Sequence, residues 1–260
     1  MVFFLLVSFV ASVVGSICGI GGGVIIKPLM DVSGMASVAV SSFLSGCTVL
    51  SMSLYSVGKL MLSGESKIQI RRSIPLVVGS IIGGFVGGQI FSFLQNILPN
   101  PELAGAIQAG CLFVVTIGTL LYTINKNKIP TLTVSNDILV CLIGFGLGTM
   151  SSLLGIGGGP INLVVLFYFF SMDTKTASQN SLFIILFSQI SNLFTTIITS
   201  SVPSFDPISL ILMVFGGIVG GIVGRAFSKK MNNSHTDKLL IGLMIVIMVI
   251  CVYNIYRFSV

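Results

Sequence analysis

The chain contains few charged residues: they make up 8% of its 260 positions, and tryptophan is absent. A soluble domain of this length carries roughly a quarter charged residues, so this scarcity excludes an ordinary soluble globular protein. Hydrophobic residues make up 54% of the chain. We therefore predict an all-α polytopic membrane protein, surrounded by the lipid bilayer.

Chemically reactive side chains are also scarce. The single histidine, His235, stands in a charged segment, and the 5 cysteines stand in apolar segments without CxxC spacing. We interpret these cysteines as small hydrophobic side chains. Because the apolar segments show no nucleophile–base pair and no cluster of metal ligands, we predict no catalytic residues, no metal, no cofactor and no enzymatic activity. The net charge is +6, and its basic residues are distributed as in a membrane-topology signal. We therefore predict no nucleic-acid partner.

One short glycine-rich phrase occurs twice. Gly19-Ile20-Gly21-Gly22-Gly23 returns in the second half of the chain as Gly155-Ile156-Gly157-Gly158-Gly159. Glycine is costly in backbone entropy, and three in a row break a helix and let the backbone approach a neighbour or a ligand. The repetition predicts a duplicated unit with a special backbone site in each half.

The chain divides into long apolar stretches, most of which are long enough to cross a membrane once. The two that contain the glycine runs are too long for one span and are broken in the middle. The stretches are 2–31, 36–62, 73–95, 103–125, 137–171, 175–200, 207–228 and 238–257.

The basic residues give an orientation, because cytoplasmic loops carry an excess of Lys and Arg. If the basic loops are cytoplasmic, Lys27 and Arg257 are the two basic residues on the opposite side. The residues assigned to the cytoplasmic side are Lys59, Lys67, Arg71, Arg72, Lys126, Lys128, Lys175, Arg225, Lys229, Lys230 and Lys238.

The loop charges invert between the two halves. The loop at 63–72 is basic but its counterpart at 201–206 is not, whereas 96–102 has no Lys or Arg and its counterpart at 229–237 is basic. We therefore predict two repeats of one fold in opposite orientations, an architecture found in transporters. A parallel repeat, with each broken helix crossing once, is the alternative and fits the loop charges less well.

An inverted repeat requires an odd number of crossings in each half. Each half has three full spans, so each broken segment is expected to enter and leave on the same side. The predicted fold is two inverted-topology repeats, each a glycine-tipped broken-helix hairpin plus three transmembrane helices; whether the hairpins are re-entrant or fully crossing stays open. The repeats are 1–125 and 137–260, joined by a cytoplasmic linker at 126–136.

A second repeated pattern indicates close helix packing. Gly83-Gly84 with Gly87-Gly88 matches Gly216-Gly217 with Gly220-Gly221. Small residues at four-residue spacing let membrane helices approach closely, so we interpret both patterns as packing surfaces.

The two glycine runs, which we expect at the tips of the hairpins, are suited to binding a small anion. A helix broken in lipid must find partners for its freed backbone groups or line a cavity, and a helix N-terminus offers unpaired N–H groups and a partial positive charge. Two such tips, brought together by inverted symmetry, predict one small-anion site near the midplane. The alternative is that the glycines only permit tight packing. The tip residues are Gly21, Gly22, Gly23, Gly157, Gly158 and Gly159.

The helix after each glycine run has a polar face that predicts either a substrate path or helix–helix contacts. Lys27 is the one charge on a hairpin arm; it could attract the anion, or pair with Asp31 at the outer surface. The predicted substrate contacts beyond the tips are Ser41, Ser42, Ser45, Asn162, Gln179, Asn180 and Ser181.

Both glycine phrases, the first continuing as Val24-Ile25-Ile26-Lys27-Pro28-Leu29 and the second as Pro160, resemble the TauE/SafE family of sulfite exporters, also called the toluenesulfonate uptake permease family. The resemblance covers essentially the whole chain. It implies a bacterial or archaeal plasma-membrane permease for sulfite, sulfoacetate or related sulfonates. That family usually has a hydroxyl-rich stretch where this chain has Ser178-Gln179-Asn180-Ser181, so the Gln-Asn pair is a departure that could tune the substrate.

We therefore expect a secondary transporter that exports a small sulfur-containing or organic anion by alternating access. A passive anion channel is the alternative. Coupling to protons or sodium, and assembly as a homodimer, stay open from the sequence.

Overall fold

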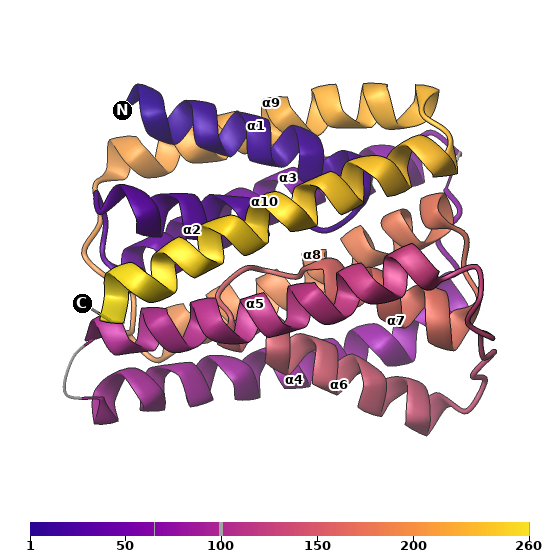
Figure 1. The fold of residues 1–260 in the computed structure, drawn as a ribbon, viewed down its shortest axis with the longest axis horizontal. Helices are drawn as coiled ribbons and strands as arrows, with labels where there is room; N and C mark the ends of the chain where they lie inside the picture. Colours follow the sequence, from indigo (N-terminus) through magenta and orange to yellow (C-terminus); the bar gives the residue numbers. More distant parts are fainter. Residues whose placement is uncertain (65, 99–100, 260) are drawn as a thin grey trace.

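The structure is a computed structural model that describes residues 1–64, 66–98 and 101–259, without the side chains of Arg72, Asn96, Pro101, Glu102 and Ser259. The described residues form ten helices and no strands (Figure 1). The helices are α1 (Val2–Cys18), α2 (Gly23–Ser33), α3 (Val38–Leu62), α4 (Ile70–Ile97), α5 (Pro101–Asn125), α6 (Asp137–Leu153), α7 (Pro160–Phe170), α8 (Thr174–Ile198), α9 (Pro207–Lys230) and α10 (Asn233–Ser259).

Several helix starts follow from local sequence. The side chains of Ser37, Asn136 and Asp206 accept hydrogen bonds from first-turn backbone N–H groups of α3, α6 and α9, which otherwise lack intrahelical partners. Pro207 occupies the first turn of α9, where a missing N–H costs nothing. These polar caps end the apolar stretches at the positions where the chain turns.

Six of the described helices are long and apolar enough to cross a membrane by length and composition, as predicted. Three shorter apolar helices are α1, α6 and α7. The candidate spans are Val38–Leu62, Ser73–Gln95, Leu103–Asn125, Thr174–Ile198, Pro207–Lys230 and Asn233–Phe258.

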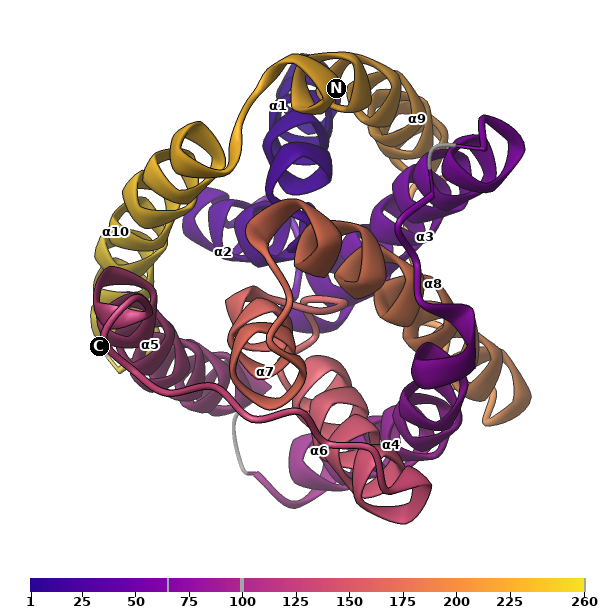
Figure 2. The ribbon, with the colours of Figure 1, turned by 90° about the vertical axis from the view of Figure 1, so that its right-hand side faces the viewer.

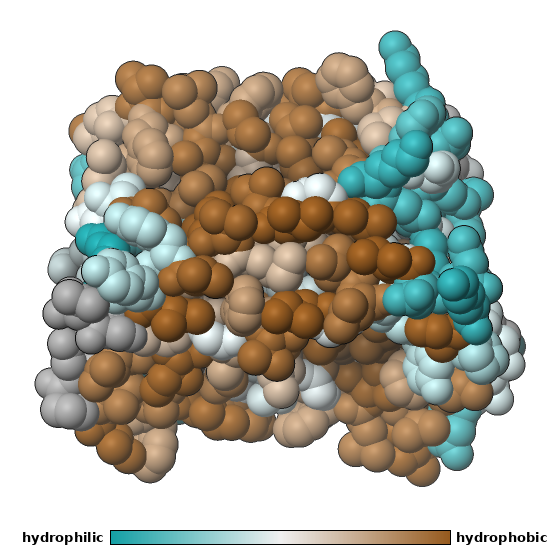
Figure 3. Space-filling view, viewed as in Figure 1, coloured by the Kyte–Doolittle hydropathy of each residue, from teal (hydrophilic) through white to brown (hydrophobic). Residues whose placement is uncertain are grey.

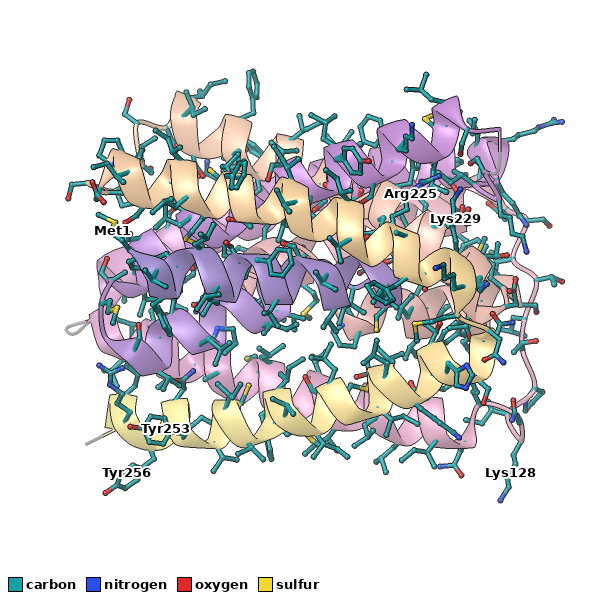
Figure 4. All side chains as sticks on the ribbon, turned by 90° about the horizontal axis from the view of Figure 1, so that it is seen from above. Met1, Lys128, Arg225, Lys229, Tyr253 and Tyr256 are labelled. Carbon is teal, nitrogen blue, oxygen red and sulfur yellow. The ribbon has the colours of Figure 1, made fainter. Side chains whose placement is uncertain are left out.

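The first broken segment, α1–α2, folds back on itself. Ser209 at the start of α9 donates its hydroxyl to the Met1 sulfur, and Arg257 near the end of α10 donates to the Val32 carbonyl at 2.7 Å. Met1 and Tyr256 lie at the same end of the molecule (Figure 4), so α1 begins where α2 ends.

The second broken segment opens at the other end. Ser171, just after α7, donates to the Thr131 hydroxyl at 2.7 Å, ahead of α6. Lys128 and Lys229 lie at that end, opposite Met1 (Figure 4). The two helix hairpins, α1–α2 and α6–α7, therefore open toward opposite ends.

The surface matches this arrangement. In Figure 3 apolar residues cover the middle of the visible face, and hydrophilic residues gather at the end that holds the basic loops. Viewed along the helices, α2 and α7 lie inside a ring of longer helices (Figure 2). The interior of the molecule is thus occupied by the inner arms of the two hairpins.

The glycines at four-residue spacing lie in close helix contacts, as predicted, and these contacts join the two halves. A methyl group on Gly83 or Gly87 of α4 would overlap the backbone of α6 at Phe145 or Thr149. In the same way, a methyl group on Gly220 of α9 would overlap the backbone carbonyl of Phe9 in α1. Each outer hairpin arm is therefore held at short range by a long helix from the other half.

Candidate functional site

The two glycine tips meet inside the molecule. A Cβ atom built on Gly21 would lie 3.5 Å from the carbonyl oxygen of Gly157, and one on Gly23 would overlap the carbonyl oxygen of Ile156. Gly21 and Gly157 have φ values of 72° and 67°, which favour glycine. Both tips are buried, so the repeated phrase produces one shared backbone contact.

The contacts around the tips are reciprocal. A methyl group on Gly19, in the first tip, would overlap Ser178 of α8. A Cβ atom on Gly155, in the second tip, would lie 2.6 Å from Oγ of Ser42 in α3. The Ser178 hydroxyl also donates to the carbonyl of Cys18 at 2.8 Å. Each tip is therefore packed against the polar helix of the opposite half.

Each tip leads directly into a helix N-terminus. Gly22 and Gly159 are the N-cap residues of α2 and α7, and no side chain caps either helix by a hydrogen bond. Pro160 follows at the start of α7, as predicted. The first backbone N–H groups of a helix have no intrahelical acceptor and carry partial positive charge, so both tips present groups that favour an anion.

Buried polar atoms without a hydrogen-bond partner among the described residues gather around these tips. Buried polar groups in proteins are nearly always paired, so such a concentration is typical of a site that takes a polar ligand or water. The unpartnered atoms on the tip-forming and neighbouring helices include the hydroxyls of Ser12, Ser41, Ser42, Ser151, Ser152, Ser181 and Ser188, the amide oxygens of Asn162 and Gln189, and Oδ1 of Asp31.

A cavity of about 90 Å³ approaches the second tip from the end where α8 terminates. Ser42, Ser152 and Gly155 form its inner part, and Thr199 and Ser201 lie toward its mouth. Asn192 and Thr195 also line it, so the predicted polar face of α8 does border a cavity. We call this the Ser42 cavity.

A second cavity, of about 190 Å³, lies at the basic end. Ser16 and Ser178 place it beside the first tip, and Lys67, Lys175 and Arg225 give it a positive lining. Arg225 is held by hydrogen bonds to the Ser56 carbonyl at 3.0 Å and the Ser63 hydroxyl at 2.9 Å. We call this the Ser178 cavity.

The predicted contacts fall into two groups. Ser41, Ser42, Ser45, Asn162 and Ser181 lie on helices beside the tips, and the Ser45 hydroxyl reaches the carbonyl of Gly23 at 3.5 Å. All except Ser42 are buried.

Gln179 and Asn180 bond to the α3–α4 loop, and Gln179 also lines the Ser178 cavity. The Gln179 side chain accepts from the backbone N–H of Lys67 at 2.8 Å. The Asn180 side chain accepts from the N–H of Gln69 and the Ser73 hydroxyl at 3.1 and 2.9 Å, and donates to the Lys67 carbonyl at 3.3 Å. In this structure the pair fastens a loop.

Sequence reasoning missed Gln189 and Ser152. The Gln189 amide donates to the Gly46 carbonyl at 3.3 Å and lies against Gly157. Ser152 stands just before the second glycine run and lines the Ser42 cavity. The position of Ser152 next to the helix break was a usable signal. No such signal in the sequence singles out Gln189 within α8.

Lys27 pairs with Asp31, but not at the outer surface. Its Nζ lies 2.7 Å from Oδ2 of Asp31, and both side chains are 4% exposed. The Cε atom of Lys27 would lie 3.2 Å from a Cβ on Gly155. The expected surface pairing is therefore wrong in its location: the ion pair is buried, and the lysine stem reaches the second tip.

Polar contacts at the basic end join the start of α8 to α10 and to the segment that follows α5. The Lys126 ammonium contacts the Asp237 carboxylate at 2.6 Å and the Thr174 hydroxyl at 2.9 Å. Burial pushes the pKa of the Asp173 carboxyl upward, but hydrogen bonds from Thr176 and Asn233 and the charge of Lys67 leave that pKa below its ordinary value. No group of three or more His, Cys, Asp or Glu that could hold a metal occurs among the described residues.

Comparison with known proteins agrees with the resemblance seen in the sequence. The family model described as Sulfite exporter TauE/SafE matches residues 4–250. The comparisons with curated proteins and with solved structures gave no significant match. With glycine tips buried between membrane-length helices and a family match over nearly the whole chain, this multi-pass membrane protein belongs to the TauE/SafE family of sulfite exporters, a family of membrane transporters.

Proposed function

We propose that this protein is a secondary transporter that exports a small sulfur-containing anion, such as sulfite or a sulfonate, across the plasma membrane by alternating access. The observation that carries the proposal is the meeting of the two glycine tips, with two uncapped helix N-termini and unpartnered hydroxyl and amide groups around them. Backbone N–H and hydroxyl groups can all donate hydrogen bonds to an oxyanion.

The proposed architecture is a pair of inverted repeats, 1–125 and 137–260, joined by a cytoplasmic linker at 126–136. In it α1–α2 and α6–α7 are re-entrant hairpins that enter the membrane from opposite sides. The opposite openings of the hairpins and the reciprocal contacts Gly19–Ser178 and Gly155–Ser42 support this arrangement. Inverted repeats with broken helices are a recurrent way to build a midplane substrate site.

In the proposed cycle, the anion reaches the tips through one of the two cavities. The Ser42 cavity and the Ser178 cavity approach the tips from opposite ends of the molecule. Rocking of one repeat against the other would open the tips to each cavity in turn, while contact between Gly21 and Gly157 closes the route between them. Gly22, Gly23, Gly158, Gly159, Ser41, Ser42, Ser45, Asn162 and Ser181 remain the proposed contacts in the loaded state.

Ligand-induced stabilisation tests the site directly. Sulfite at about 100 times its dissociation constant should stabilise the purified protein by ~2.7 kcal/mol, seen as a higher melting temperature in detergent. Ser42→Ala should reduce this shift because it removes a hydroxyl beside the second tip. Gly158→Leu should abolish the shift, since Gly158 has a φ of 113° and packs against Ile185.

A matched control separates ligand binding from folding. Thr116 is also buried and its hydroxyl also has no partner among the described residues, but it lies on α5, which packs mainly against α10. Thr116→Val, which removes that hydroxyl and keeps a similar shape, should keep the full sulfite shift. If Ser42→Ala and Gly158→Leu, when folded, respond to sulfite as the wild type does, the proposed site is wrong. Linear sulfite conductance in a planar bilayer would instead favour the channel.

A further inference from the structure

A small cavity beside the second tip gathers oxygen acceptors from three helices. It measures about 10 Å³, close to the room needed by one water molecule. Lys27 and Asp31 of α2, Gln108 of α5, and Asn254 of α10 line it. These residues are at most 5% exposed, so the cavity is a polar site enclosed within the helices.

This cavity has more hydrogen-bond acceptors than donors. Oδ1 of Asp31, Oε1 of Gln108 and Oδ1 of Asn254 have no hydrogen-bond partner among the described residues. The amide orientations are fixed by their nitrogens, since Gln108 donates to the Leu153 carbonyl at 2.7 Å and Asn254 to the Pro28 carbonyl at 3.0 Å. Both amide oxygens are therefore left without a donor.

The Lys27 ammonium is the charged hydrogen-bond donor in the wall of this cavity, and it already donates to Asp31. Oδ2 of Asp31 accepts from Lys27 Nζ at 2.7 Å. The titratable and charged groups that α10 brings to the pair are Cys251, which lines the cavity, and Arg257, whose guanidinium binds the carbonyls of Asp31 and Val32. Gln108 of α5 and Leu154, after α6, contribute no charge. Three acceptor oxygens in the cavity, on Asp31, Gln108 and Asn254, therefore have no donor among the described residues.

We propose that Asp31 is the proton-binding residue that couples proton movement to anion transport, with Lys27 as the group that links the two. The inference rests on the proposed transport of an anion at the glycine tips. Asp31 in its protonated form would donate its hydroxyl to the amide oxygen of Gln108 or Asn254, both of which face the same cavity.

The link works because Lys27 reaches two places. Its stem lies against Gly155 of the second tip while its ammonium binds Asp31. When an anion enters at the tip, the ammonium, which keeps its proton, moves from Oδ2 of Asp31 to the anion. A buried carboxylate that loses its counter-ion is strongly disfavoured, so Asp31 takes one proton from the solution that supplied the anion.

The charges balance for a monovalent anion. Without substrate, the ammonium and the carboxylate sum to zero; with substrate, the ammonium and the anion sum to zero and Asp31 is neutral. One anion and one proton therefore bind and leave together. A metal cation fits less well, because the ammonium of Lys27 already lies in the cavity wall and repels it.

The test measures proton and anion movement separately in vesicles containing the purified full-length protein. At a mildly acidic pH, where sulfite is chiefly the monovalent hydrogensulfite ion on both sides of the membrane, a sulfite gradient should move protons in the same direction as sulfite, reported by a pH-sensitive dye, and an imposed pH gradient should accelerate sulfite transport at least several-fold. Asp31→Asn should lose the proton movement and the response to a pH gradient. Lys27→Met should reduce sulfite transport at least tenfold.

The matched control is Asp237→Asn, which removes a carboxylate from a different ion pair, the one with Lys126 at the basic end. It should retain both movements. An infrared difference spectrum on adding sulfite should also show the carbonyl stretch of a newly protonated carboxylic acid in the wild type and in Asp237→Asn but not in Asp31→Asn. The wild-type measurements stand even if a variant fails to fold.

Each outcome decides the proposal. Sulfite transport without proton movement, transport driven by a sodium gradient instead, or proton movement that persists in a folded Asp31→Asn variant would each overturn it while leaving the proposed transport intact. Absence of both sulfite transport and sulfite-induced stabilisation in the wild type would instead overturn the proposed function, and the coupling with it.

Discussion

Gly23 lies so close to the carbonyl oxygen of Ile156 that a methyl group at position 23 would overlap it. The two residues belong to different glycine runs, and their contact joins the first hairpin to the second. The missing side chain at position 23 therefore sets how closely the two broken helices meet.

Gly23→Ala should destabilise the protein by about 1–3 kcal/mol, because an added group in a tightly packed interior forces its neighbours apart. The measurement is the melting temperature of the purified protein in detergent. Gly58→Ala is the control, since nothing lies within 4 Å of a Cβ atom there; it should leave stability unchanged or raise it by up to ~1 kcal/mol, because alanine favours a helix more than glycine does. Equal melting temperatures for the two variants would contradict the observed tip contact.

Gly155→Ala should also destabilise the protein, for two separable reasons. Its φ of 64° costs a non-glycine residue roughly 1–2 kcal/mol, and its Cβ would lie 2.6 Å from the Ser42 hydroxyl. Adding Ser42→Gly should relieve the second cost only. A double-mutant cycle should therefore give a coupling of at least ~0.5 kcal/mol; strictly additive effects would show that the two residues do not touch.

Gly83→Ala should weaken the packing of α4 on α6, since the methyl group would overlap the Phe145 backbone. We expect a loss of about 1–3 kcal/mol, measured by thermal unfolding. Gly110→Ala on α5, where the space is open, should be neutral or slightly stabilising, because alanine favours a helix more than glycine does. Comparable losses at both positions would mean that the contact with α6 does not determine the effect.

Asn180→Ala tests whether this residue holds a loop or contacts the substrate. Its side chain has four hydrogen bonds to Lys67, Gln69, Ser73 and Thr176, so its loss should cost about 1–3 kcal/mol. Hydrogen exchange should increase at 66–69, while the sulfite-induced shift persists. Loss of that shift, with the loop still protected from exchange, would favour the substrate contact expected from the sequence.

Acid should weaken the α7–α8 junction through Asp173. The pKa of its carboxyl in the folded protein is lowered from an ordinary 3.8. A lowered pKa contributes stability that is present above the unfolded value and disappears as the pH falls through the folded value. Melting temperature should therefore fall less steeply below pH 3.8 in Asp173→Asn than in the wild type; parallel curves would contradict this assignment.

Much of the fold could be predicted from the sequence because the signals are local. Low charge and long apolar runs predict membrane helices, and the segment from Val38 to Leu62 matches its helix closely. The glycines at four-residue spacing, such as Gly83 and Gly87, predicted close packing. Their partners could not be predicted, because that choice depends on which helices meet in space.

The candidate site was predicted less completely. Ser42 and Asn162 do lie beside the tips. The sequence pointed to them because hydroxyl and amide groups near a helix break have few other uses in an apolar chain. Asn180 looked similar but bonds to a loop far away in sequence, and Gln189 was missed although it touches Gly157. A hydrogen-bond partner many residues away leaves no local pattern.

The sequence by itself indicated a helical membrane protein with a glycine-marked break in each half, because composition and glycine runs act on the chain wherever they occur; the duplication of the fold stays a prediction. Only the tertiary structure decided that Gly21 meets Gly157, that Ser42 and Ser178 pack on opposite tips, and that Lys27 is buried with Asp31. Those relationships depend on long-range packing, in which close backbone approach and the pairing of buried charges select one arrangement among many.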